Sequence, residues 1–219
     1  MLHVRGLQLN VFTPEQLRTY PVNIASPDTY IQRWSEDVMM LYLEDTAALG
    51  AGVMSLLPGW EFINESRLEN YERACASIGR LCTRAQELGV TMVMEPVAPC
   101  ESTFVTDLLS LRRIIDGVAS PALRPCIDLS AAAAAEESVA SWLDTFSMPT
   151  HVHLADGDPD GYLPLGEGKN DIAGQLAALA AAGYAGEIAL CFNNAAYFAD
   201  PDRPVRTSAL WLHQSGLVR

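Results

Sequence analysis

Apolar positions along the chain alternate between two spacings, and the alternation predicts strands and helices in turn. Short, nearly continuous apolar runs predict buried strands, expected over residues 3–12, 52–57, 91–94, 123–129, 150–155 and 187–192. Apolar residues three or four positions apart predict helices, expected over about 28–49, 68–88, 104–117, 132–147, 170–182 and 203–215. Six strand–helix units in strict alternation favour a parallel sheet that is buried on both faces.

The first of these helices is predicted in most detail. Ser26 is expected to cap its start, with Pro27 in the first turn, and Gly50 is expected to end it. The stripe expected to face the core is apolar throughout, and its members are Ile31, Trp34, Val38, Leu41 and Ala48.

Two architectures fit this alternation: an open doubly wound sheet and a (β/α) TIM-type barrel. No glycine-rich phosphate loop follows any expected strand, which weakens the dinucleotide-binding option. Polar residues end several successive strands, and this favours a barrel with a central site. No linker interrupts the chain, so a single domain over residues 1–219 is predicted.

The composition and net charge of the chain disfavour several classes of binding partner. The chain has 219 residues, 49% of them hydrophobic, which is enough for one sizeable core. A net charge of −13 would repel nucleic acids and anionic membranes, and no apolar run reaches the ~18 residues that a membrane span needs. The start lacks the apolar core of a signal peptide, and five scattered cysteines favour reduced thiols in the cytoplasm.

The candidate chemistry lies where the strands end: at Glu95, Asp128, His153 and, less clearly, Cys191. Carboxylates and an imidazole that converge at one edge of a parallel sheet form a divalent-metal site. Other roles remain open, since Asp128 could simply cap the helix that follows it. His151 faces the same way as His153 but one layer deeper, as a satisfied core residue or a substrate contact.

Six stretches carry a resemblance that extends from about residue 13 to 213: TYPVNIAS, LGVTMVMEPVAPCES, CIDLS, HVHLADGD, LPLGEGK and AAGYAGEIAL. In their order and spacing the chain resembles the xylose isomerase-like TIM-barrel superfamily of sugar isomerases and epimerases. Within it, the chain is most similar to ketose 3-epimerases and fructoselysine 3-epimerase.

The resemblance implies a metal ion, usually Mn²⁺, Co²⁺ or Mg²⁺, held by two glutamates, an aspartate and a histidine. Glu95, Asp128 and His153 match three of these ligands, and Glu101 would contact substrate hydroxyls. The metal would stabilise an enediolate as a Lewis acid. One glutamate would remove a proton from one face of the sugar, and the other would return it from the opposite face.

The sequence departs from the family pattern at two places. Cys191 stands where the family has its second metal-binding glutamate, and neither Asn193 nor Asn194 replaces that acid. A thiolate can bind metal and would shift the preference toward Zn²⁺, but it puts the two-base mechanism in doubt.

The second departure concerns length. A full barrel of the family has eight strand–helix units, and the six units here match the last six. The first two, roughly 50–60 residues at the usual size of such units, have no counterpart. Strand edges at 3–12 and 187–192 would then be open. A homo-oligomer that covers the open edge is expected, and the alternatives are that the remaining strands close differently or that the sequence is truncated.

The leading hypothesis is a metal-dependent isomerase or epimerase that acts on a small ketose or sugar derivative through an enediolate. Glu95 would be the catalytic base, Trp60 would contact the sugar beside Glu101 and His151, and loop 157–169 would form a lid. The alternative is a catalytically impaired or non-catalytic barrel relative that serves as a binding or assembly subunit. An apurinic endonuclease is disfavoured by the acidic charge.

Overall fold

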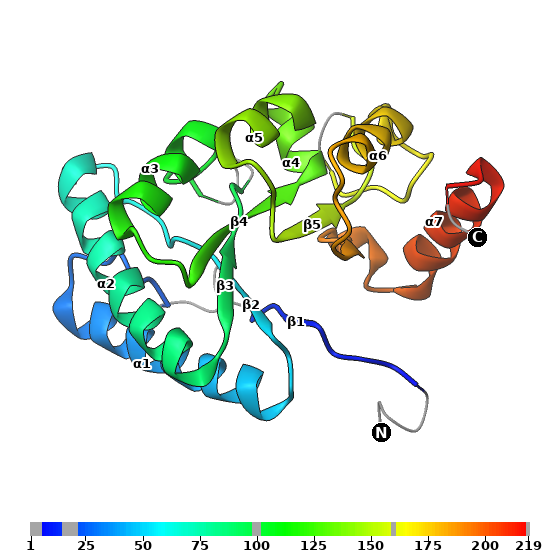
Figure 1. Ribbon diagram of the computed structural model, residues 1–219. Coiled ribbons are helices and arrows are strands. Elements are labelled where there is room, and N and C mark those ends of the chain that lie inside the picture. Colours follow the sequence, from blue (N-terminus) through cyan, green and yellow to red (C-terminus); the bar gives the residue numbers. More distant parts are fainter. Residues whose placement is uncertain (1–5, 15–21, 98–101, 159–160, 218–219) are drawn as a thin grey trace. The chain divides into compact units, whose positions relative to one another are not determined.

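Parallel strands alternate with helices along the chain in a computed structural model that describes residues 6–14, 22–97, 102–158 and 161–217 (Figure 1). Each strand pairs with the next strand along the chain, and every pairing is parallel. The prediction of six strand–helix units is therefore confirmed. The chain divides into two compact units, Met1–Pro125 (unit 1) and Cys126–Arg219 (unit 2), and the boundary falls within strand β4.

Within the ranges that the structure describes, unit 1 contains three strands, three helices and the first half of β4. Its elements are β1 (Val11–Phe12), α1 (Thr29–Ala48), β2 (Val53–Leu56), α2 (Arg67–Leu88), β3 (Thr91–Met94), α3 (Leu108–Val118) and the start of β4 (Leu123–Asp128). The described part of the first predicted strand is thus regular only at Val11–Phe12. The core of unit 1 consists of fully buried side chains that include Met39, Leu43, Met54, Leu56, Ile78, Leu81, Met92, Met94, Leu111 and Ile114.

Helix α1 begins two residues later than the predicted cap implies. Asp28 is the N-cap, and its Oδ1 accepts hydrogen bonds from the backbone N–H groups of Tyr30 and Ile31. The predicted cap, Ser26, is instead buried, and its hydroxyl accepts a bond from the Asp28 N–H. The assignment of Ser26 was wrong because the longer carboxylate reaches the unpaired amides of the first turn.

The buried face of α1 also differs from the predicted stripe. The residues that α1 buries are Ser35, Met39, Leu43 and Thr46. Trp34 and Leu41 are 37% and 60% exposed. The predicted stripe contained only apolar residues and so left out serine and threonine. The Ser35 hydroxyl donates to the Ile31 carbonyl and the Thr46 hydroxyl donates to the Tyr42 carbonyl, in each case one helical turn earlier. Such a bond lets a hydroxyl enter the core without an unsatisfied polar atom.

In its described residues, unit 2 contains the second half of β4, two further strands, four α-helices and one short 3₁₀ helix. Its elements are α4 (Leu129–Ala134), α5 (Val139–Phe146), β5 (His151–Leu154), α6 (Ile172–Ala181), β6 (Ile188–Leu190), the short 3₁₀ helix η2 (Ala195–Tyr197) and α7 (Asp202–Ser215). The core of unit 2 includes the buried side chains of Ile127, Leu129, Trp142, Val152, Leu154 and Leu179.

The single helix predicted over 132–147 is two helices, so that prediction was wrong. After α4 the chain turns through Glu136, whose φ angle is 57°, and Ser138 then caps α5 by accepting a bond from the Ser141 N–H. The indole N–H of Trp142 donates to Glu137 across this turn at 2.9 Å. Alanine-rich sequence favours helix at every position, so its periodicity did not reveal the break.

No helix in the described ranges is both long enough and apolar enough to cross a membrane.

Candidate functional site

The candidate site of unit 2 lies where three neighbouring strands end. Asp128 is the last residue of β4, His153 lies in β5, and Cys191 follows β6 directly. Asp128 and His153 are paired across the sheet, and the Cys191 N–H continues the next ladder by donating to the Leu154 carbonyl at 3.0 Å. The expectation that Asp128 and His153 occupy corresponding positions of neighbouring strands is therefore confirmed.

The side chains of these residues converge. A carboxylate oxygen of Asp128, a ring nitrogen of His153 and the Cys191 sulfur all lie within 4.8 Å of one another. Ligand atoms on a tetrahedral metal ion are about 3.6 Å apart when each metal–ligand bond is about 2.2 Å long. Small side-chain rotations would bring the three atoms onto one ion, so the donors fit a divalent metal.

Asp128 caps a helix, a role that the sequence left open. Its Oδ1 accepts bonds from the backbone N–H groups of Ser130 and Ala131, both at 2.9 Å, so the residue is the N-cap of α4. Both bonds use the same carboxylate oxygen, and the side chain is only 2% exposed. A carboxylate can cap a helix with one oxygen and bind a metal with the other, so the two roles are compatible.

The two histidines of β5 lie on the same face, as their spacing predicted. Their ring centroids are 5.0 Å apart and the ring planes are nearly perpendicular, at 89°. Both side chains are buried. The His151 ring therefore packs edge-to-face against the His153 ring and restricts its orientation.

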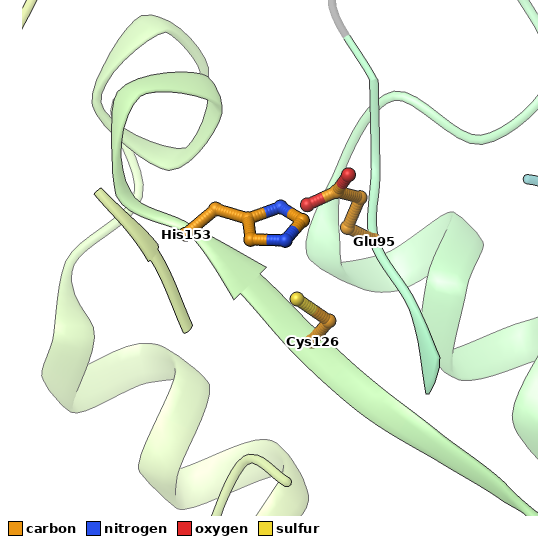
Figure 2. Close-up of side chains that lie close together, drawn as sticks. All are labelled: Glu95, Cys126 and His153. Carbon is orange, nitrogen blue, oxygen red and sulfur yellow. The ribbon is translucent and has the colours of Figure 1, made fainter. Parts of the chain in front are cut away.

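Cys126 is a neighbour of His153 that sequence reasoning did not select as a ligand. It lies on β4, two residues before Asp128, and Figure 2 shows its thiol beside the His153 ring. Its sulfur lies within 4.8 Å of a ring nitrogen of His153. Strand alternation placed Cys126 and Asp128 on one face, and that signal could have identified it.

Tyr184, which precedes β6, is not a candidate base. Burial, with contributions from negative charge at Cys126 and Glu187, raises its pKa to about 12. Its hydroxyl donates to the Glu187 carbonyl at 2.7 Å. Tyr184 is therefore a neutral hydrogen-bond donor near pH 7.

Glu95 belongs to unit 1 and follows β3 directly, where Figure 2 draws its side chain. The side chain is half-buried, and the neighbouring Pro96 and Val97 are buried. A hydrogen bond of 3.0 Å from the Val97 N–H to the Val105 carbonyl holds the chain just beyond it. Glu95 ends a strand as predicted, and its part in a metal site stays a prediction. Glu101 lies outside the described residues.

Trp60 follows the turn after β2 and is partly exposed. The Asn23 side chain holds its backbone, because the amide nitrogen donates to the Trp60 carbonyl at 3.1 Å and the amide oxygen accepts from the Trp60 N–H at 3.4 Å. The same oxygen accepts from the Ala25 N–H. The backbone at Trp60 is thus fixed to the segment before α1, and its contact with a sugar remains a prediction.

Asp156 is the main feature of unit 2 that sequence reasoning missed. Its carboxylate is 2% exposed and accepts four backbone hydrogen bonds. The donors are the N–H groups of Gly157 at 2.8 Å, Gly166 at 2.9 Å, Gly168 at 3.1 Å and Asn170 at 3.1 Å. A side chain at Gly168 would overlap the carboxylate, which explains the glycine there. The described part of the predicted lid is therefore anchored to the end of β5.

A comparison with protein families gives a match over nearly the whole chain. The model of the xylose isomerase-like TIM barrel family matches residues 1–215. The chain belongs to this family. The expected (β/α) TIM-type fold is confirmed, with six parallel strands in the described residues.

The two curated proteins that match this TIM-barrel chain are both named fructoselysine 3-epimerase. Fructoselysine 3-epimerase of Escherichia coli O157:H7 is 26% identical over 179 residues, which are 80% of this chain and 64% of that protein. The chain therefore spans a little under two thirds of the length of the curated relatives it matches.

Two solved structures extend the comparison of the fold. The 3-keto-D-glucoside 4-epimerase of E. coli aligns with a TM-score of 0.83 at 20% identity and covers 97% of this chain and 81% of its own. The D-psicose 3-epimerase of Clostridium cellulolyticum H10, solved with D-tagatose, aligns with a TM-score of 0.78 at 18% identity and covers 99% and 80%. At these identities the two structures support the fold.

Proposed function

We propose that the chain is a metal-dependent isomerase or epimerase that acts on a small ketose or sugar derivative through an enediolate. The observation that carries the proposal is the convergence of Asp128, His153 and Cys191 at the strand ends of unit 2. Membership of a family of sugar-modifying barrels, and relatives that are named as epimerases, give the reaction class. The fold alone would not indicate the reaction class, because barrels of the same fold catalyse many different reactions.

A bound divalent cation would supply Lewis-acid stabilisation of the negative charge that develops when a carbon beside the ketone loses its proton. Asp128, His153 and Cys191 would hold the cation in unit 2. Glu95 is proposed as a further ligand and as the base that takes the proton. Its position directly after β3 is the place where barrel enzymes carry catalytic residues.

The proton must return to the sugar, and Cys191 affects how it returns. The family pattern has a glutamate at that place, which would return the proton from the face opposite Glu95. Without this acid, Glu95 alone can remove a proton and return it on the same face. We therefore expect exchange of the C–H hydrogen with solvent to be faster than inversion, and a one-base isomerisation to be favoured over a two-base epimerisation.

Substrate contacts and assembly complete the proposal. Trp60, His151 and Glu101 are proposed to contact the sugar. Among the described residues, β1 pairs with β2 alone and β6 pairs with β5 alone, so each has one strand edge that a second copy of the chain could cover. A homo-oligomer of this kind and a cytoplasmic location remain proposals.

The experiment that tests the proposal compares two substitutions of glutamate. Glu95→Gln keeps the size of the side chain but removes the base, and it should abolish turnover of every ketose that the wild type accepts. Glu72→Gln, on the exposed surface of α2, is the matched control and should leave turnover unchanged. Full activity of Glu95→Gln would refute the assigned base.

The alternative is a non-catalytic binding or assembly subunit of the same fold, and Cys191 in place of an acid favours it. A screen with fructoselysine, D-psicose, D-tagatose and 3-keto-glucosides separates the two functions. Measurable turnover of any of them excludes a non-catalytic role. Binding of a sugar without exchange of its C–H hydrogens would favour that role.

A further inference from the structure

Unit 1 has a cavity of about 220 Å³ between the starts of α2 and α3. The loops that lead into these helices leave the sheet at the carboxyl ends of β2 and β3, where Glu95 also lies. Three charged side chains line the cavity, and they belong to Arg67, Asp107 and Arg113. Buried apolar side chains also line it, and they are those of Phe104, Val105 and Ile114.

Hydrogen bonds within the chain hold the walls of this cavity. The Arg67 Nη2 donates to the Thr103 carbonyl at 3.1 Å and joins the start of α2 to the loop after β3. The Tyr71 hydroxyl donates to the Arg113 carbonyl at 2.7 Å and joins α2 to α3. Burial raises the pKa of Tyr71 to about 12, so this side chain adds no charge to the cavity near pH 7.

The charges in the cavity are one cation and one carboxylate that are not paired with each other. The Arg67 guanidinium is paired with Glu61 at 3.3 Å, so its charge is balanced. Among the residues that the structure describes, the Arg113 guanidinium forms no ion pair, although Asp107 lines the same cavity. Asp107 caps α3 with Oδ1, which accepts bonds of 2.7 Å from the N–H and the hydroxyl of Ser110. Its other carboxylate oxygen can therefore accept from a ligand.

We propose that this cavity binds the zwitterionic head group of an amino acid that is joined to the ketose. The Arg113 guanidinium binds the carboxylate of the head group, and the second oxygen of Asp107 accepts from its ammonium group. Each charge of the ligand then meets an opposite charge. The inference rests on the proposed function for the sugar, and it narrows the substrate to a ketose derivative that carries an amino acid.

A ligand with one charge or none fits this cavity less well. A phosphate or a single carboxylate would gain the contact with Arg113 but would lie beside the like charge of Asp107, which disfavours binding. An uncharged sugar would use neither charge. Leu109, which is 74% exposed, also lines the cavity and offers apolar surface to the carbon chain between the sugar and the head group.

The first test measures ligand binding to the full chain by isothermal titration calorimetry. Fructoselysine is the probe, because it joins a ketose to the side-chain nitrogen of lysine and leaves the α-amino and carboxylate groups free. It should bind at least roughly 10-fold more tightly than D-fructose, since hydrogen bonds to charged groups contribute about that much. The Nα-acetyl derivative of fructoselysine lacks the ammonium group and its carboxamide lacks the carboxylate, so each should lose most of this gain.

The second test changes the two charged residues. Arg113→Gln should weaken binding of fructoselysine by roughly 10-fold and leave binding of D-fructose unchanged. Asp107→Asn keeps the cap of α3, because asparagine caps helices as well as aspartate does. It should weaken binding of fructoselysine but strengthen binding of the Nα-acetyl derivative, since the repulsion of the carboxylate is removed. Arg112→Gln is the control, because Arg112 is paired with Asp116 at 2.6 Å and does not line the cavity.

Three results would overturn the inference. The first is fructoselysine that binds no more tightly than D-fructose, or not at all. The second is Arg113→Gln that binds fructoselysine as tightly as Arg112→Gln does. The third is Asp107→Asn that binds fructoselysine and its Nα-acetyl derivative equally weakly, because Asp107 would then only support the structure of the loop.

The outcomes also separate this inference from the proposed function. Binding that depends on both charges of the head group, without exchange of any sugar hydrogen, supports the cavity and contradicts the enzyme. Turnover of D-psicose or D-tagatose, with no effect of the head group on binding, supports the enzyme and contradicts the role of the cavity.

Discussion

Replacement of Asp156 by alanine should destabilise unit 2 more than any single surface substitution. The carboxylate accepts hydrogen bonds from the backbone N–H groups of Gly157, Gly166, Gly168 and Asn170. Asp156 is only 2% exposed, so water does not readily take the place of its carboxylate as the acceptor of these bonds. Alanine would leave four backbone N–H groups without their acceptor.

The magnitude follows from these contacts. A hydrogen bond to a charged group contributes about 1.5–3 kcal/mol, and four of them would sum to more than single substitutions usually cost. The loop can loosen and hydrate part of the amides, so we expect a loss of about 3–5 kcal/mol in the free energy of unfolding. At about 2–4 °C per kcal/mol for a chain of this size, the melting temperature should fall by roughly 10 °C.

Two measurements check the loss and locate it. Denaturant unfolding followed by circular dichroism gives the free energy, and hydrogen exchange should show lost protection at the amides of Gly166 and Gly168. Asp158→Asn is the matched control, because its ion pair with Lys169 is exposed and contributes little. If Asp156→Ala unfolds within about 1 kcal/mol of that control, the carboxylate does not hold the loop.

Substitutions at three further positions test other contacts of the fold and the site. Asp128→Asn should lose metal but keep the cap of α4, because the asparagine oxygen can still accept the two backbone bonds. Asp128→Ala should lose both the metal and about 1 kcal/mol of stability, measured by thermal melting. Retention of metal by Asp128→Asn would contradict the ligand role. Gly117→Ala should destabilise unit 1 measurably in urea, since the added methyl would overlap the Tyr71 hydroxyl, and unchanged stability would contradict this packing. Burial is the largest single influence on the pKa of Glu36 and raises it, but hydrogen bonds from Arg80 and Ser77 and the charges of Arg80 and Arg33 together lower this pKa below its ordinary 4.5. The Glu36 carboxylate therefore stabilises the fold above pH 4.5 and loses that effect as pH falls through its folded pKa. Glu36→Gln should therefore cost about 0.5–1 kcal/mol at pH 7 and little at pH 3 by denaturant unfolding, and an equal cost at both would contradict it.

The order of strands and the residues at their ends could be predicted from the sequence, because buried parallel strands are short apolar runs. Asp128 and His153 were found in this way, and their pairing across β4 and β5 follows from the same alternation. The positions that were not predicted depend on side-chain hydrogen bonds, and the spacing of apolar residues in the sequence contains no information about these bonds. Ser35 lies in the core because its hydroxyl bonds the preceding turn, and Asp156 closes a loop through amides up to 14 residues away.

Cys126 was not selected as a candidate ligand for another reason. Cysteine is commonly buried as a small apolar residue, so a cysteine in a strand carries little information about chemistry. Only the position of its sulfur beside His153 distinguishes it. The break between α4 and α5 was hidden in the same way, because alanine favours helix on both sides of it.

The most direct test of metal-dependent enolisation is exchange of a ketose hydrogen in heavy water, followed by proton NMR. The metal-loaded chain should replace the hydrogen beside the ketone with deuterium, and the metal-stripped chain and Glu95→Gln should not. Because Cys191 stands in place of an acid, exchange should precede inversion. Equal exchange with and without metal, or none with any ketose tested, would contradict the account.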